Sequence, residues 1–128
     1  MSRVVLDASA LMAVLNGEPG GEKLTPQIMS GATASTVNLA EVHGKLVQRG
    51  FTPEDAWAAA NGVVDEAVAF TAEQAKTAGD LVVQTRALGL SFGDRACLAL
   101  GLALRAPVYT ADRAWKHLKL GIRIHVIR

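Results

Sequence analysis

The sequence has 128 residues and a net charge of +1, and half of its residues are hydrophobic while a fifth are charged. This length and composition suit one compact domain over residues 1–128 and argue against a disordered chain. No apolar run reaches the length of a membrane span, and no signal peptide is recognisable. The single cysteine, Cys97, excludes an intramolecular disulfide. We therefore expect a cytoplasmic protein with no membrane partner.

The charges are divided unevenly along the chain. Residues 1–94 carry 6 Lys or Arg and 11 Asp or Glu, whereas residues 95–128 carry 7 Lys or Arg and the single acid Asp112. The last third of the chain is therefore strongly basic. Such a segment suits the docking of a polyanion or, equally well, a solubilising face, and charge alone does not choose between them.

Strand and helix patterns alternate along the chain. Short apolar runs predict strands, and apolar residues at helical spacing, with start and stop signals, predict helices. In chain order the prediction is strand 3–7, helix 8–16, turn 17–21, helix 21–30, strand 32–35, helix 36–50, helix 52–67, strand 68–70, helix 71–89, helix 91–106, strand 107–110, helix 111–118 and strand 122–127. This alternation predicts an α/β fold, a single-domain α/β/α sandwich with a mostly parallel sheet. A ligand crevice is expected outside the carboxyl ends of the strands.

Four acidic residues follow predicted strands or lie in the helices after them. Asp7 ends the first strand, Asp94 begins the most apolar helix, and Asp112 follows the fourth strand. Each has an ordinary explanation as a helix cap or a first-turn acid. Glu41, inside the helix after the second strand, is explained equally simply by a solvated pair with Lys45.

Taken together, the four acids predict a metal site. A parallel sheet places Asp7, Asp94 and Asp112 at one rim, with Glu41 about one helical turn from it. Carboxylates that converge in a partly desolvated cleft repel one another, and a divalent cation offsets that repulsion. Oxygen ligands favour Mg²⁺ or Mn²⁺. A water bound to such an ion becomes a nucleophile toward a phosphodiester.

Four segments contain the four acids, in this order along the chain: VVLDASALMAVLNGE, STVNLAEVHGKL, LGLSFGDRACLALG and VYTADRAWKHLKLGIRIHVIR. They resemble the motifs of PIN-domain ribonucleases, and most closely those of the VapC-type toxins of bacterial toxin–antitoxin modules. The resemblance extends over essentially the whole chain at the spacing of the family. It implies the PIN-type α/β/α sandwich and an Mg²⁺- or Mn²⁺-dependent endoribonuclease that hydrolyses RNA and acts as the toxin of such a module.

The resemblance also implies roles for individual residues. The four acids would hold one or two Mg²⁺ or Mn²⁺ ions, and Asp7 and Asp94 match the ligands most often assigned in the family. Three further residues match positions that support the acids, namely Ser9, Asn38 and Thr110. Members of the family typically form homodimers and are held inactive by an antitoxin protein. The expected partners are therefore RNA, a cognate antitoxin and a second copy of the chain.

Basic and aromatic residues of the last third are candidates for RNA contact. We expect Arg95, Arg113 and Lys116 to hold the RNA backbone. The two tryptophans are predicted to be packing residues. Of the two, Trp115 is the better candidate for stacking on a base, because basic residues surround it.

Two alternatives without catalysis also account for an acidic pocket in a doubly wound sheet. A receiver-like signalling domain would need an acid pair after the first strand and a late Lys at a strand end, and the sequence has neither. A degenerate PIN domain that only binds a partner is the other alternative. The four acids themselves show no departure from the pattern of the family.

Overall fold

The computed structural model describes residues 2–128, which form one five-stranded parallel sheet with the order β3-β2-β1-β4-β5. The strands are β1 (Val4–Leu6), β2 (Ala32–Ser35), β3 (Glu66–Val68), β4 (Val108–Thr110) and β5 (Ile124–Val126). Each neighbouring pair is parallel, so all the carboxyl ends of the strands meet at one rim. The predicted mostly parallel sheet is confirmed.

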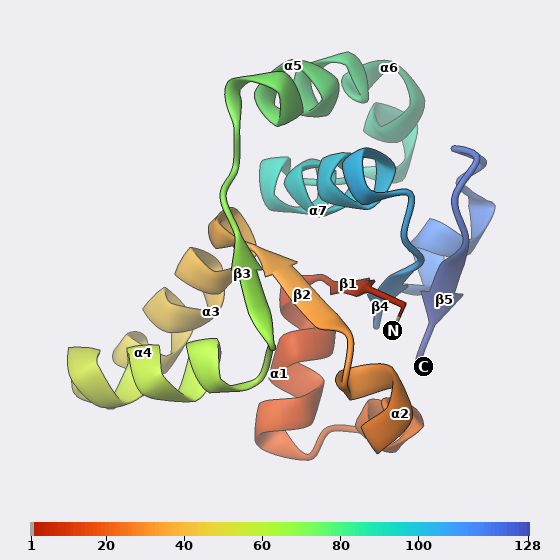
Figure 1. Ribbon diagram of the computed structural model, residues 1–128. Helices are drawn as coiled ribbons and strands as arrows, with labels where there is room; N and C mark the ends of the chain where they lie inside the picture. Colours follow the sequence, from red (N-terminus) through yellow and green to blue (C-terminus); the bar gives the residue numbers. More distant parts are fainter. Residues whose placement is uncertain (1) are drawn as a thin grey trace.

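Helices cover both faces of this sheet, as Figure 1 shows. The longer helices are α1 (Ala8–Asn16), α3 (Thr36–Gln48), α4 (Pro53–Gly62), α5 (Ala72–Asp80) and α7 (Phe92–Leu104). Shorter helical segments are η1 (Gly21–Lys23), α2 (Pro26–Met29), α6 (Val82–Thr85), η2 (Arg86–Leu88) and η3 (Arg113–His117). Helices α1, α3 and α4 lie on one side of the sheet, and α5, α6 and α7 lie on the other (Figure 1). The expected α/β/α sandwich is confirmed. Within residues 2–128, no helix is long and apolar enough to cross a membrane.

The central strand β1 is buried on both faces. Val4 and Leu6 belong to the core beneath α1 and α3, whereas Val5 belongs to the core beneath α7. Successive side chains of a strand point to opposite faces, so a strand covered on both faces needs an unbroken apolar run. The sequence VVL meets that need, and it carries the residue that follows, Asp7, to the rim.

Two predicted helices are interrupted in the structure. The helix predicted over 21–30 is divided into η1 and α2, because Thr25 caps a new helix that has Pro26 in its first turn. A proline there removes the N–H group that a continuous helix would need. The helix predicted over 71–89 is divided into α5, α6 and η2 and ends at Gly89, which has a φ of 69°.

Smaller differences concern the ends of elements. Helix α4 ends at Gly62 rather than at residue 67, and β3 begins two residues before the strand predicted over 68–70. Only residues 113–117 of the helix predicted over 111–118 are helical, as a 3₁₀ helix. These differences leave the rim of the sheet in its predicted place.

Candidate active site

Asp7 follows β1 and caps helix α1 at the rim of the sheet. Its Oδ1 accepts hydrogen bonds from Ser9 Oγ at 2.7 Å and from the Ala10 N–H at 2.8 Å. Its Oδ2 accepts one from Thr110 Oγ1 at 2.6 Å. The residue is only 3% exposed. A carboxylate oxygen has two lone pairs, so the capping role occupies Oδ1 and leaves Oδ2 with one lone pair for a further ligand.

The Asp7 carboxylate is costly to bury in its charged form. Burial raises the pKa of Asp7 from 3.8 to about 6, although the hydrogen bonds from Thr110, Ala10 and Ser9 oppose the rise and the Asp94 carboxylate adds slightly to it. The ion pairs of the described residues are Arg3–Glu66, Lys76–Asp80 and Arg128–Glu18. None of the four predicted acids therefore has a basic partner within residues 2–128.

The segment after β4 is tied to Asp7 by two hydroxyl groups. Thr110 Oγ1, which donates to Asp7, accepts the Asp112 N–H at 3.0 Å, and Ser9 Oγ accepts the Ala111 N–H at 2.8 Å. Asp112 caps η3 by accepting the Ala114 N–H at 2.9 Å and is exposed. Ser9 and Thr110 thus link the buried Asp7 to the segment that carries the exposed Asp112.

Asn38 joins the acid of α3 to the start of α7. Its Nδ2 donates to Glu41 Oε1 at 2.8 Å and to the Gly93 carbonyl at 3.0 Å. Asn38 is 1% exposed, and its Oδ1 is buried without a hydrogen-bond partner among the described residues. Both Nδ2 protons are used, so Asn38 links the Glu41 carboxylate to the first turn of α7.

Asp94 belongs to the capping box of α7. Its Oδ2 accepts the Ser91 N–H at 2.9 Å, and its own N–H donates to Ser91 Oγ at 3.2 Å. One turn further along, burial raises the pKa of Cys97, and the carboxylates of Asp7, Asp94 and Glu41 raise it further. The carboxylates of these three acids therefore all act on the same buried thiol at the rim of the sheet.

The donors at this rim fit a hydrated Mg²⁺ or Mn²⁺ better than a closed cage of protein ligands. In the part of the chain that the structure describes, no three His, Cys, Asp or Glu side chains are arranged to hold one ion directly. Mg²⁺, however, commonly keeps several waters and takes only one or two carboxylates. Asp7 Oδ2 keeps a free lone pair, and the four acids have no basic partner among residues 2–128, so hard oxygen donors are open to such an ion.

The residues predicted to contact RNA differ in their surroundings. Arg113 and Lys116 are exposed on η3, beside Asp112. Arg95, in contrast, donates from Nε to the Ala78 carbonyl at 3.1 Å, which ties α7 to α5. Trp115 is fully buried, so its predicted packing role is confirmed, whereas the prediction that it is the better of the two tryptophans for stacking is wrong, because Trp57 is 44% exposed. Sequence reasoning passed over Phe92, which is 51% exposed two residues before Asp94.

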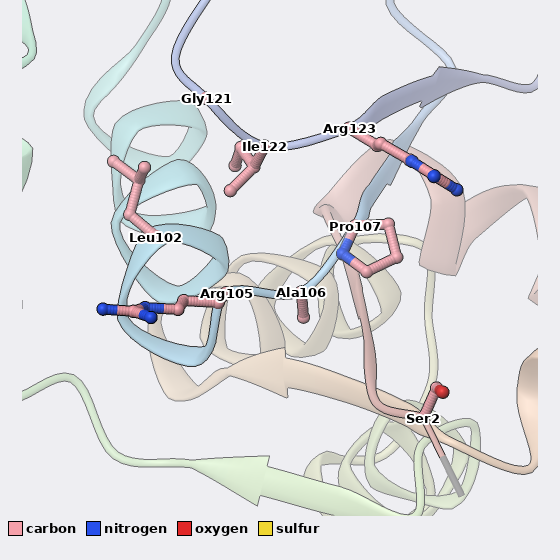
Figure 2. A pocket seen from close by; sticks show the side chains of 8 residues that line it. All are labelled: Ser2, Leu102, Arg105, Ala106, Pro107, Gly121, Ile122 and Arg123. Carbon is pink, nitrogen blue, oxygen red and sulfur yellow. The ribbon is translucent and has the colours of Figure 1, made fainter.

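A cavity of about 690 Å³ lies at the other end of the strands. Pro107 and Arg123 line it just before β4 and β5, and Leu102 and Ile122 face it. Figure 2 shows the side chains of Arg105 and Arg123 on opposite sides of the cavity, pointing away from one another. Because no charged groups converge there, we place the candidate active site at the acidic rim instead.

Comparison with known proteins shows the family and the fold of the chain. Residues 4–120 match the family model described as "PIN domain". A comparison with curated proteins gives no match. The fold resembles the DNA-bound VapBC of Salmonella typhimurium (TM-score 0.76, 17% identity, 100% of each chain). It also resembles VapBC-5 of Mycobacterium tuberculosis (TM-score 0.60, 21% identity, 100% of this chain and 99% of that chain). A third similar structure is VapC20 of the same organism, described as a sarcin-ricin loop cleaving toxin (TM-score 0.70, 20% identity, 94% of this chain and 98% of that one).

Proposed function

Because this chain belongs to the PIN-domain family, we propose that it is a metal-dependent endoribonuclease and the VapC-type toxin of a toxin–antitoxin module. The observation that carries the proposal is the buried Asp7 carboxylate, which lies at the same rim as Asp94 and has no basic partner in residues 2–128. The similarity in fold to a toxin that cleaves the sarcin-ricin loop supports RNA as the substrate. The family match argues against the receiver-like alternative.

The residues of the rim have distinct tasks in this proposal. Asp7 and Asp94 hold the ion, and Glu41 and Asp112 complete its surroundings directly or through water. When bound, Mg²⁺ or Mn²⁺ supplies a Lewis acid and lowers the pKa of a bound water. Ser9 and Thr110 keep the Asp7 carboxylate fixed and favour its charged form through their hydrogen bonds.

Two further groups act on the position of the substrate. Asn38 holds Glu41 against α7 through Nδ2. Arg113 and Lys116, exposed beside Asp112, attract the RNA backbone and bring a phosphate toward the acids. Hydrolysis then requires a water aligned with the scissile P–O bond, which the fixed acids orient.

Cleavage of RNA by the purified protein tests this proposal. We expect cleavage with Mg²⁺ or Mn²⁺, loss of cleavage in a chelator, and loss in Asp7→Asn and Asp94→Asn. Glu73→Gln, an exposed acid in the first turn of α5, is the matched control and should cleave normally. Absence of cleavage with either metal, or full activity in Asp7→Asn, would contradict the proposal and favour a PIN domain that only binds a partner.

We further propose that the chain has a cognate antitoxin and forms a homodimer in the cytoplasm. The resemblance to solved VapBC toxin–antitoxin complexes supports an antitoxin partner. Induced expression should arrest growth, and co-expression of the product of the neighbouring gene should relieve the arrest. Light scattering of the purified chain measures the oligomeric state, and a monomeric mass would refute the homodimer.

A further inference from the structure

Phe92 lies at the acidic rim, on the same turn of α7 as Asp94. It is the first residue of the helix, directly after the cap Ser91 and directly before Gly93, whose carbonyl accepts from Asn38. Phe92 and Asp94 are two residues apart, so their side chains leave α7 in different directions, on either side of Gly93. Gly93 itself lies against the Glu41 carboxylate. An RNA strand that crosses the N-terminal end of α7 therefore passes from the acids to the Phe92 ring.

The Phe92 ring is held in place by a second aromatic ring. It forms a T-shaped pair with Phe70, with the ring centroids 5.6 Å apart and the planes at 87°. Phe70 follows β3 at the same rim, and its N–H donates to Thr36 Oγ1 at 3.2 Å, at the start of α3. Edge-to-face pairs of this kind are favourable and directional. The contact with Phe70 thus favours one orientation of the Phe92 ring before any ligand arrives.

At least one face of the Phe92 ring remains uncovered. In a T-shaped pair, one ring presents its edge to a face of the other, so Phe70 covers at most one face of Phe92. Phe92 is 51% exposed. The other exposed Phe and Trp side chains among the described residues lie elsewhere, since Phe51 follows the far end of α3 and Trp57 packs against His43 in the middle of that helix.

We propose that Phe92 is a positioning residue that stacks an unpaired RNA base beside the phosphate to be cleaved. This inference rests on the proposed ribonuclease function and adds a substrate requirement to it. A phenyl ring has no hydrogen-bonding group, so it accepts any base that offers a free face. Bases inside a duplex are already stacked on both sides, so the ring selects RNA in which the nucleotide beside the cut is splayed out.

Substitution of Phe92 tests the requirement for an aromatic face. We expect Phe92→Leu, which keeps an apolar side chain without a ring, to lower kcat/KM on single-stranded RNA by roughly five- to 150-fold, the range for one stacked base. Phe92→Trp should restore cleavage. The control Phe51→Leu removes a ring of similar exposure away from the rim and should cleave as the parent does. Thermal melting of each variant checks folding.

RNA substrates with a single abasic site separate stacking from a structural role. The substrates are copies of one short single-stranded RNA cleaved by the parent protein, each lacking one base near the cut. The parent should lose rate at one particular position, and Phe92→Leu should lose nothing further there. A loss that is equal in the two proteins at every position overturns the stacking role. If the parent cleaves and Phe92→Leu matches it on intact RNA, only this inference fails, whereas a parent that cleaves no RNA refutes the proposed function itself.

Discussion

Asp7 combines two roles that the sequence presents as alternatives. Its Oδ1 caps α1 and accepts two hydrogen bonds, while Oδ2 accepts one and keeps a free lone pair. The same burial that fixes the carboxylate also raises its pKa to about 6. Burial deprives the charged carboxylate of hydration by water. A bound cation would replace that lost hydration by a direct electrostatic attraction, so the site is suited to a cation.

Asp7→Asn should therefore stabilise the metal-free protein near pH 7. A pKa of about 6 in the folded state, against 3.8 unfolded, corresponds to a cost of roughly 2–3 kcal/mol for the charged form. Since the folded pKa is the higher one, the contribution is fully favourable below pH 3.8 and is lost as the pH rises through about 6. Urea unfolding in a chelator between pH 4 and pH 7 measures it. The stability of the parent should fall across this window relative to Asp7→Asn, and a constant difference would contradict the prediction.

Gly93 keeps a place for the Glu41 carboxylate against α7. A Cβ at residue 93 would lie 2.5 Å from Glu41 Oε2. Gly93→Ala should therefore displace Glu41 and lower cleavage by up to the order of 10²-fold, the cost of misplacing a reacting group. Stability should change by less than about 1 kcal/mol, because alanine favours a helix and the carboxylate can move. Gly79→Ala, with nothing within 4 Å of its Cβ, is the control in the same RNA-cleavage and urea-unfolding assays. Normal cleavage by Gly93→Ala would show that the position of Glu41 is unimportant.

At the scale of elements, local sequence signals predicted the strands and most helices. They could not predict features that depend on contacts between elements. The run VVL and the caps at Asp7 and Ser91 have local causes, and each was recognised. The division after α5 was missed because Leu81, Val82 and Val83 continue an apolar helical pattern.

The candidate site shows the same division. Asp7, Asp94 and Asp112 could be placed at one rim because strand ends in a parallel sheet fix their position. The burial of Trp115 and the exposure of Phe92 could not be predicted from the sequence, because each depends on which neighbouring element covers the side chain. The bond from Asn38 to Gly93 spans 55 residues, and no local pattern specifies it.

Arg95 connects two elements, and its substitution tests whether that is its main role. Its Nε donates to the Ala78 carbonyl in the last turn of α5, where carbonyls lack helical partners and the helix dipole favours a cation. Arg95→Gln should lower the free energy of unfolding by about 1 kcal/mol. Urea unfolding measures this loss of free energy, and Lys119→Gln, a substitution at an exposed residue, is the control. If Arg95→Gln and Lys119→Gln were equally stable, the hydrogen bond to Ala78 would have no role in stability, and RNA contact would be the one remaining role for Arg95.

At the scale of the molecule, basic residues occupy both ends of the sheet. Arg113 and Lys116 lie beside Asp112 at the carboxyl rim, and Arg105 and Arg123 line the cavity at the amino ends. The chain as a whole carries a net charge of only +1. Surface charges act over about one Debye length, roughly 8–10 Å in physiological salt. Whether RNA is drawn to the acidic rim therefore depends on which basic residues lie beside that rim.

The salt dependence of RNA binding distinguishes the two basic regions. Each phosphate contact on a single strand contributes about 0.7 to the slope of log K against log salt concentration. Replacing both Arg113 and Lys116 by Gln should therefore reduce that slope by about 1.4. Replacing both Arg105 and Arg123 by Gln removes the same charge from the opposite end of the strands and should leave the slope unchanged. Binding to a labelled single-stranded RNA, measured in chelator so that no cleavage occurs, gives both slopes. Equal slopes in the two double variants would mean that net charge, rather than the basic residues beside the acids, attracts the RNA.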